Sequence, residues 1–332
     1  MEPLVSIVIP AYCHEKYIDD CLDSIIGQTY QNIELIIIDD CSIDNTYKKI
    51  LCRRHELEYR FCRVVIQQNE VNLGVVVTEN RLLALCRGKY IKSIGSDDMI
   101  LENGIELLVD YYEQHQEYDF IFSNELLCSE KEKFPIIDIR QYQRAYLSIP
   151  DLGGNIMQKL YEDDFIQAPT VLFKKATFEK YGIYDETLTI EDWEYWLRVA
   201  ERGRIGYCDQ CTVAYRVSGN SLSHFETDEE GRKRLRKMYY NQSRILKKYE
   251  KSPRICAYEG YKQFYEKMLQ KAIDIGEREL QREIIDSILE KRIFINLETC
   301  LKYICYKLHV LKIIQRIKRL LGMETADSYK VE

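Results

Sequence analysis

Pairs of adjacent carboxylates occur at three places where the chain leaves one regular pattern for another. Asp39-Asp40 follows an apolar run, Asp97-Asp98 follows a second run, and Glu191-Asp192 opens a helical pattern. Carboxylates are hard oxygen ligands that suit Mg²⁺ or Mn²⁺, and a carboxylate can also accept a proton from a hydroxyl group. Acidic pairs that share one rim repel each other, so such a rim favours a bound cation or a polar ligand.

The first half of the sequence predicts the elements that would carry these pairs. Short runs rich in Ile, Val and Leu alternate with amphipathic patterns at helical spacing. The predicted strands are 4–9, 33–38, 63–67, 89–94 and 118–123, and the predicted helices are 18–26, 44–55, 75–86 and 102–115. Repeated strand–helix–strand units predict an α/β fold with a doubly wound sheet, which binds ligands beyond the carboxyl ends of its strands. The first two carboxylate pairs and Pro10-Ala11-Tyr12 would then share one edge.

The second half has a less regular pattern. Residues 127–165 give weak signals, strands are expected at 169–173 and within 206–217, and a helix is predicted over 191–202. Beyond residue 225 only long helical patterns rich in Lys, Glu and Arg occur. We therefore expect an α/β domain over 1–225, a helical C-terminal region over 226–322 and a flexible tail over 323–332.

Composition limits the classes of function. The 332-residue chain is 46% hydrophobic and 30% charged, which is typical of folded globular proteins. Its net charge of −7 combines −14 in residues 1–225 with +7 in residues 226–332. So acidic a body is a poor nucleic-acid binder, and a phosphorylated ligand would need a recruited cation. Twelve cysteines without an export signal predict reduced thiols in a cytoplasmic protein.

The segment 300–321 has a basic side and an apolar side at helical spacing. The basic side carries Lys302, His309, Lys312, Arg316 and Arg319, and the apolar side carries Ile304, Leu308, Leu311, Ile314, Ile317 and Leu321. Such a helix can lie on an anionic membrane surface, which would place the protein at the inner face of the cell membrane. The same face could instead pack on neighbouring helices or on a second copy of the chain in a homo-oligomer.

Motifs of one enzyme family occur in order along the chain. They are Val5-Ser-Ile-Val-Ile-Pro-Ala-Tyr12 with Glu15, Asp39-Asp40-Cys-Ser42-Ile-Asp44, Asn72-Leu-Gly74 with Asn80, Gly88-Lys-Tyr-Ile91, Ser96-Asp97-Asp98 and Glu191-Asp192. In this combination the sequence resembles family 2 of the GT-A glycosyltransferases, over 4–125 and again over 168–223. The resemblance implies a GT-A fold with a doubly wound mixed sheet flanked by helices, a nucleotide-sugar donor, a divalent Mn²⁺ or Mg²⁺ ion and an inverting transfer.

The resemblance also implies which residues bind the donor. Asp40 corresponds to the aspartate that reads the base, and a carboxylate can accept the ring N–H of uracil, which favours a UDP-sugar. Ala11, Tyr12, Glu15 and Asp97 would contact the same donor, with Tyr12 offering a ring for stacking.

The chemistry of transfer is assigned in the same way. Asp97 and Asp98 would bind the metal, Asp192 would be the catalytic base, and Glu191 would lie on the acceptor side. The acceptor would be a saccharide or lipid-linked saccharide in the synthesis of a surface polysaccharide or glycan. The chain has no Gln-x-x-Arg-Trp motif and no apolar stretch of the ~20 residues that cross a bilayer, so addition of a single sugar is favoured.

The chain departs from the family pattern at two positions. Gly95 replaces the first Asp of the commonest metal motif, and Ser218 stands where the family often has a His. A metal ligand from the segment around Ser218 is therefore not expected. Arg216 in the same segment could still meet a phosphate.

Other enzyme classes share an α/β sheet. A nucleotide-binding dehydrogenase or methyltransferase would have a G-x-G-x-x-G turn after the first strand, where this chain has Pro10-Ala11-Tyr12. A nucleotidyltransferase would want a glycine- and lysine-rich segment there. That class and a catalytically inactive homologue, suggested by Gly95, stay open as alternatives.

Overall fold

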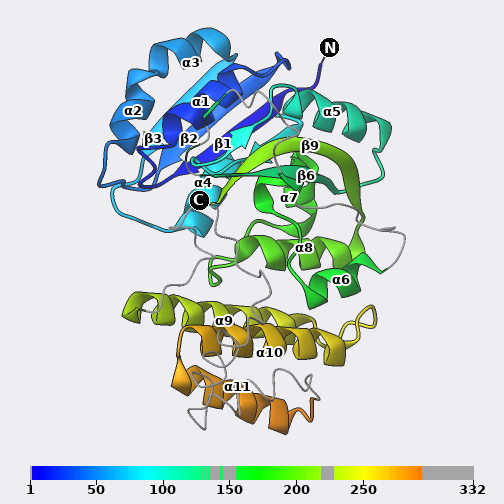
Figure 1. The fold of residues 1–332 in the computed structure, drawn as a ribbon. Coiled ribbons are helices and arrows are strands. Elements are labelled where there is room, and N and C mark those ends of the chain that lie inside the picture. Colours follow the sequence, from blue (N-terminus) through cyan, green and yellow to red (C-terminus); the bar gives the residue numbers. More distant parts are fainter. Residues whose placement is uncertain are drawn as a thin grey trace. The chain divides into compact units, whose positions relative to one another are not determined.

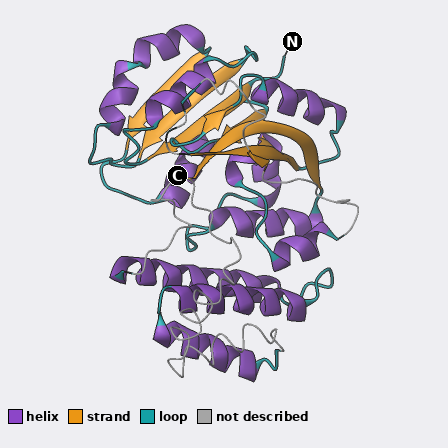
Figure 2. Cartoon of the chain, viewed as in Figure 1, coloured by secondary structure: helices purple, strands orange, loops and turns teal. Residues whose placement is uncertain are grey.

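The computed structural model describes residues 2–129, 131, 133–134, 143–144, 155–217 and 228–293. The chain divides into two compact units, Met1–Leu160 with Asp164–Ser218, and Tyr161–Asp163 with Gly219–Glu332. The first unit contains the sheet, and the second contains the helices α9 to α11 (Figures 1 and 2). The segment 300–321 and the tail 323–332 lie outside the described residues.

A nine-stranded mixed sheet forms the centre of the first unit, in the order β3-β2-β1-β4-β8-β6-β9-β5 with β7 beside β6. The strands are β1 (Val5–Ala11), β2 (Ile33–Asp39), β3 (Arg63–Gln68), β4 (Tyr90–Ser93), β5 (Met99–Ile100), β6 (Phe120–Ser129), β7 (Gln143–Arg144), β8 (Val171–Lys174) and β9 (Ile205–Val217). Strands β1 to β4 pair in parallel, whereas β8 is antiparallel to both β4 and β6, and β9 is parallel to β6. The predicted doubly wound mixed α/β sheet is confirmed.

Helices cover both faces of the parallel half of the sheet. Those of the first unit are α1 (Ile18–Ile26), α2 (Thr46–Cys52), α3 (Arg54–Arg60), α4 (Val75–Leu85), α5 (Gly104–Gln114), α7 (Lys175–Tyr181) and α8 (Glu191–Arg202), and α6 (Ile156–Glu162) ends in the second unit. Ile7, Leu35 and their alternate neighbours share one core with α1, α3 and α5, while α4 packs on the other side of β1 and β2. Every residue of β2 is buried, as its run of Ile and Leu predicts.

The observed boundaries differ from the expected ones at two places near the site. Strand β1 continues through Pro10 to Ala11, because β4 ends at Ser93 opposite Val8 and the missing N–H of Pro10 leaves no ladder bond unmade. The helix predicted over 75–86 ends at Leu85 as α4, and Gly88 lies beyond it. A Cβ on Gly88 would lie 2.7 Å from the backbone N of Ser6, so glycine is required there by close packing.

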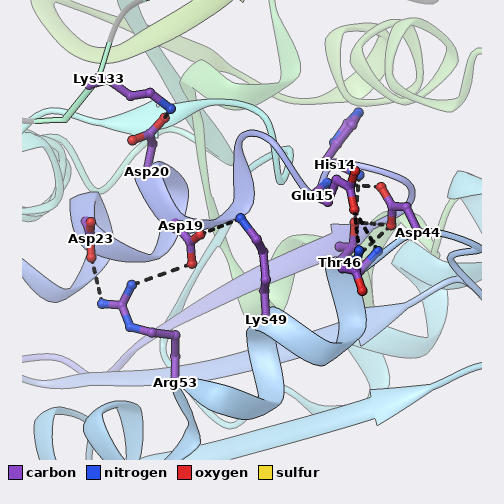
Figure 3. A network of polar contacts seen from close by, with 11 residues as sticks. His14, Glu15, Asp19, Asp20, Asp23, Asp44, Thr46, Lys49, Arg53 and Lys133 are labelled. Atoms are coloured by element: carbon purple, nitrogen blue, oxygen red, sulfur yellow. Dashed lines mark hydrogen bonds and ion pairs between the residues drawn. The ribbon is translucent and has the colours of Figure 1, made fainter.

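Other differences concern short or interrupted elements. The helix predicted over 44–55 is split into α2 and α3 at Arg53, whose guanidinium pairs with Asp23 of α1 at 2.6 Å (Figure 3). Lys49 of α2 pairs with Asp19 of α1 at 2.7 Å. The two-residue strand β5, and α6 within the weak region, were not predicted because they show no clear periodicity.

The second unit contains three described helices, α9 (Glu229–Tyr249), α10 (Ala257–Asp274) and α11 (Arg278–Glu290). The ring of Tyr239 stacks on that of Phe264 with centroids 5.4 Å apart, and Arg236 pairs with Glu277 at 2.6 Å. Within the described ranges, every helix is too short or too polar to span a bilayer.

A buried carboxylate ties the strands to the segment after α4. Glu34 of β2 accepts the Ser6 hydroxyl at 2.5 Å, the Arg87 N–H at 2.6 Å and the Gly88 N–H at 3.1 Å, and its other oxygen accepts from the Arg63 guanidinium at 2.6 Å. Burial alone would raise the pKa of Glu34, but these hydrogen bonds outweigh burial and hold the pKa below its ordinary value of 4.5.

We expect Glu34→Gln to lower the free energy of unfolding by about 2 kcal/mol at neutral pH, because the amide cannot accept from all four donors. Since the pKa of Glu34 is lowered by folding, its stabilisation is present above the ordinary pKa and is lost as the pH falls through the lowered pKa. Urea unfolding at several pH values measures both effects. Glu58→Gln, in an exposed pair with Arg54, is the control and should cost less than about 0.5 kcal/mol. Equal losses for the two variants would contradict the assignment.

Candidate active site

The structure brings the predicted donor-side and metal-side residues to one edge of the sheet. Strands β2, β1 and β4 are parallel neighbours, so Asp40, Tyr12 and the loop that contains Asp97 and Asp98 all follow carboxyl ends of adjacent strands. The carbonyl of Ala11 accepts the N–H of Asp40 at 2.7 Å, which joins the first two segments directly. The shared edge predicted from the sequence is therefore present.

The two carboxylates of the first pair have different surroundings. Asp39 accepts the N–H and the hydroxyl of Ser42 at 2.9 and 2.6 Å, and so orients its own loop. Asp40 is buried, and it accepts from the Asn69 amide at 2.6 Å and from the N–H groups of Leu73 and Gly74 at 2.8 Å each. Asp40 thus shapes the loop after β3, a connection that the motif spacing did not reveal.

Tyr12 offers an exposed ring beside this loop. Its side chain is 43% exposed, whereas Ala11 at the end of β1 is buried. The Asn72 side chain hydrogen-bonds the Tyr12 hydroxyl, and the neighbouring thiol of Cys13, followed by burial and the charge of Asp40, raises the pKa of Tyr12. An exposed ring next to a buried carboxylate is a surface on which a planar base can stack.

Glu15 contacts the protein chain in this structure. Its Oε2 accepts the backbone N–H of Asn45 at 3.0 Å and the Asn45 amide at 2.9 Å, and its own N–H donates to Asp44 at 3.1 Å (Figure 3). These hydrogen bonds fasten the loop after β1 to the loop before α2. The predicted contact of Glu15 with the donor stays a prediction.

Gly95 explains the form of the metal motif in this chain. A Cβ at residue 95 would lie 2.9 Å from Oδ1 of Asp97 and 3.2 Å from Oδ2 of Asp98. Both carboxylates therefore turn back over the glycine, with one oxygen of each near the same point. An aspartate at residue 95 would have to displace them, so the departure from the commonest motif creates the room in which the pair lies.

The two carboxylates differ in exposure. The Asp97 side chain is 25% exposed, whereas Asp98 is buried and accepts the backbone N–H of Arg216 at 2.9 Å. Burial, followed by the negative charge of Asp97, raises the pKa of Asp98 well above its ordinary range. A bound cation would offset both effects, so the pair fits a divalent metal.

The residues also fit the way in which such a metal is held. Among the described residues, no cluster of three or more His, Cys, Asp and Glu side chains could hold an ion by itself. Mg²⁺ typically takes one or two carboxylates and completes its shell with water and substrate phosphates. Asp97 and Asp98 match that pattern.

Arg216 of β9 binds the loop after β4 that contains Asp97 and Asp98. Its guanidinium is fully buried, donates to the Asp97 carbonyl at 2.8 Å, and lies 4.9 Å from the centre of the Tyr17 ring. It also approaches Asp20 of α1 at 3.5 Å. The suggestion that Arg216 meets a phosphate is therefore wrong, because its side chain is enclosed by the protein.

His14 is a site residue that sequence reasoning missed. Its ring Nδ1 lies 2.8 Å from the Ser96 hydroxyl and 3.6 Å from Oδ1 of Asp97. Its backbone N–H donates to the Thr46 hydroxyl at 2.8 Å. His14 thus links the loop after β1 to the loop that contains Ser96 and Asp97. The sequence could have indicated this contact only through the position of His14, two residues after Tyr12 of the first motif.

The third carboxylate pair begins α8, as predicted. Indole N–H groups fix this helix, since Trp193 donates to the Leu160 carbonyl at 2.6 Å and Trp196 to the Ile166 carbonyl at 3.1 Å. Asp192 accepts the N–H of Trp193 at 2.7 Å. Burial raises the pKa of Asp192, and burial together with the charge of Asp192 raises that of Glu191.

Helix α4 connects this pair to the edge of the sheet. Asn80 of α4 exchanges hydrogen bonds of 3.0 Å with both backbone groups of Tyr184, in the loop that leads into α8. The adjacent Glu79 accepts the hydroxyl of Ser93, the last residue of β4, at 2.6 Å. The charge of Asp192 acts on Glu79, so the start of α8 lies near the carboxyl end of β4. The structure thus brings all three pairs to one region.

The chain is similar in sequence to known glycosyltransferases. The family described as glycosyl transferase family 2 matches residues 6–180. An uncharacterized glycosyltransferase of Haemophilus influenzae is 30% identical over 69% of this chain and 70% of that protein. The putative teichuronic acid biosynthesis glycosyltransferase TuaG of Bacillus subtilis is 26% identical over 67% of this chain and 82% of its own length.

Solved structures share the fold at low sequence identity. TarS 1-349 from S. aureus, in complex with UDP-GlcNAc, covers 82% of this chain and 73% of its own, with a TM-score of 0.57 at 18% identity. The mannosyltransferase PcManGT from Pyrobaculum calidifontis, in complex with GDP-Man and Mn²⁺, covers 98% of this chain and 89% of its own, with a TM-score of 0.58 at 12% identity. Because the family match spans more than half of its residues, this chain belongs to glycosyltransferase family 2 and is a glycosyltransferase.

Proposed function

We propose that the protein is an inverting glycosyltransferase that moves one sugar from a nucleotide-sugar to a saccharide or lipid-linked saccharide. The observation that carries this proposal is the meeting of three carboxylate pairs at one region of the sheet edge. The acceptor hydroxyl attacks the anomeric carbon, the bond to the diphosphate breaks on the opposite face, and the diphosphate leaves with the electron pair. The hydroxyl proton passes to Asp192.

Asp192 suits the role of base for physical reasons. A base works best when its pKa is near the working pH, and burial raises the pKa of Asp192 from its ordinary value of 3.8. Its position at the first turn of α8, with one oxygen fixed by the Trp193 N–H, leaves the other oxygen for the acceptor. Glu191, beside it, is assigned to the acceptor side.

The donor is assigned to the edge formed by β1 and β2. Tyr12 stacks on the base, and Glu15 and Asp97 complete the donor contacts. The side chain of Ala11 is buried in the core of the sheet, so its predicted contact with the nucleoside stays a prediction. Asp40 reads the base, since its Oδ2 accepts only the Gly74 N–H and retains lone pairs for a ring N–H. This favours UDP, although the two solved neighbours were crystallised with UDP-GlcNAc and GDP-Man, and the shared fold does not choose between their bases.

Asp97 and Asp98 would hold a Mn²⁺ or Mg²⁺ ion, which supplies positive charge to the departing diphosphate when bound. The chain itself has no cation for that task among the described contacts of this loop, because the Arg216 guanidinium is buried and engaged. The role of this chain is to keep the two carboxylates together over Gly95.

The acceptor is proposed to belong to a polysaccharide, as the printed name of TuaG indicates for that relative. We further propose that the reaction takes place in the cytoplasm, whose reducing conditions suit the cysteines of the described residues, which form no disulfide with one another. The basic segment 300–321 would hold the enzyme on the membrane surface near a lipid-linked acceptor.

We expect Asp98→Ala to abolish metal-stimulated donor hydrolysis, because a single remaining carboxylate binds the ion weakly. A panel of UDP-, GDP- and dTDP-sugars with Mn²⁺ identifies the donor first, and chelation should remove the same activity. Asp19→Ala, which removes an exposed carboxylate of α1 paired with Lys49, is the control and should hydrolyse as the wild type does. Stimulation by Mn²⁺ that survives in Asp98→Ala would exclude this metal site.

Asp192→Asn should reduce kcat for transfer by about 10³-fold and leave nucleotide binding unchanged, because the amide cannot accept the hydroxyl proton. In the wild type, kcat should fall as the pH drops through the raised pKa of Asp192, because the protonated carboxyl is no base. Asp185→Asn makes the same chemical change in the loop before α8 and should leave the rate near wild type. A wild-type rate in Asp192→Asn would refute the base assignment.

Membrane binding by the C-terminal segment is tested by flotation with vesicles of anionic lipid. The full chain should float, and a chain that ends at Thr299 should stay at the bottom of the gradient, because it lacks the basic and apolar sides of 300–321. Neutral vesicles are the control and should bind the full chain weakly. Equal flotation of both chains would remove this proposal.

A further inference from the structure

Helix α4 buries a carboxylate that the transfer reaction, as described so far, does not use. Glu79 is 7% exposed, and its Oε1 accepts the Ser93 hydroxyl at 2.6 Å. Its Oε2 is fully buried and has no hydrogen-bond partner among the described residues. A buried carboxylate oxygen without a donor is costly when it is charged, and a ligand cannot reach it without movement of the chain.

The neighbours of Glu79 are anionic or neutral. Ser93 of β4 donates a hydrogen bond to Glu79. The titratable groups that interact with it electrostatically are Asp192 and Glu191 of α8, Tyr184 in the loop before α8 and Cys86 directly after α4. The hydrogen bonds of Asn80 to Tyr184 fix this arrangement by holding α4 against the loop. Carboxylates that share such a space do not all ionise, so one of them retains a proton.

We propose that Glu79 is a positioning residue that keeps its own proton at neutral pH, so that its charge does not oppose the ionisation of Asp192, the base. The inference rests on the proposed role of Asp192. When Glu79 is protonated, its buried Oε2 carries no charge that would need a donor to offset it. Burial and the charge of Asp192 raise the pKa of Glu79 to about 7, in agreement with this placement of the proton.

The arrangement gives the base a defined charge. If Glu79 were ionised at neutral pH, its charge would favour protonation of Asp192, and the base would be lost. A neutral Glu79 avoids this outcome, and glutamine, which is neutral at every pH, should imitate it.

A carbon-13 NMR titration of protein labelled at the glutamate side-chain carboxyl tests this proposal without any measurement of activity. Two resonances should titrate near pH 7, from Glu79 and Glu125, and only that of Glu79 should be absent in Glu79→Gln. In Asp192→Asn the midpoint of Glu79 should move down by about one pH unit, because a negative charge has been removed. If Glu79→Gln does not fold, a displaced midpoint in Glu79→Asp assigns the resonance instead.

The protein provides two controls for this titration. Burial also raises the pKa of Glu125 to about 7, but the charged neighbour of Glu125 is Lys92 and not Asp192. The resonance of Glu125 should therefore not move in Asp192→Asn. Asp185→Asn should leave the Glu79 midpoint unchanged. A Glu79 midpoint that does not respond to Asp192→Asn, or the absence of any titration of Glu79 near neutral pH, overturns the proposal.

The pH dependence of transfer gives a second readout. Glu79→Gln should keep kcat within about threefold of wild type below pH 7 and lose the inflection near neutral pH, because glutamine does not titrate. pH profiles of the same shape for the wild type and Glu79→Gln would contradict the proposal for Glu79. Should Asp192→Asn still transfer while its NMR coupling to Glu79 is observed, the base assignment fails and the coupling stands, so the two proposals are separated.

Discussion

The site depends on holding like charges together at one edge of a sheet. Parallel strands deliver their carboxyl ends to the same side, so β2 and β4 bring Asp40 and Asp98 there as a consequence of topology. Neighbouring carboxylates in poorly hydrated surroundings repel each other strongly. The chain offsets this repulsion at Asp40 with donors from the loop after β3, whereas Asp98 receives a single backbone N–H. The charge that stays uncompensated is the charge available to a cation.

The positive charge nearest to that loop is already used within the protein. Arg216 lies more than a hundred residues downstream, yet its N–H and guanidinium bind Asp98 and the Asp97 carbonyl, and its charge is shared with Asp20. Arg216 therefore fixes the shape of the loop that contains Asp97 and Asp98, and its guanidinium cannot also reach a phosphate. For the proposed diphosphate leaving group, an acidic domain with its arginine enclosed would need an external cation, and residues 1–225 carry an overall charge of −14.

The fold of the first half could be predicted because buried parallel strands leave long runs of Ile, Val and Leu, and β2 is such a run. The shared edge followed from topology alone. The contacts at the site could not be predicted, because they depend on which donors reach a carboxylate after folding. Motif spacing placed Glu15 and Asp40 near a ligand, but it did not show that Asn45 and Asn69 bind them. It also could not show that Gly95 makes room for Asp97, since that requires the side-chain directions.

Hydrogen bonding distinguishes Glu34 from three other carboxylates of this chain. Glu34 is as buried as any residue of the sheet, but four donors lower its pKa, so its charge is satisfied and its role is to stabilise the fold. Asp98 and Glu79 are buried and Asp192 is partly buried, each has one donor, and the pKa of each is raised. A protein that needed these three only for stability would gain by adding donors or by replacing them with apolar residues. Their incomplete pairing is a cost in stability, which the proposed cation and proton transfer would offset during the reaction.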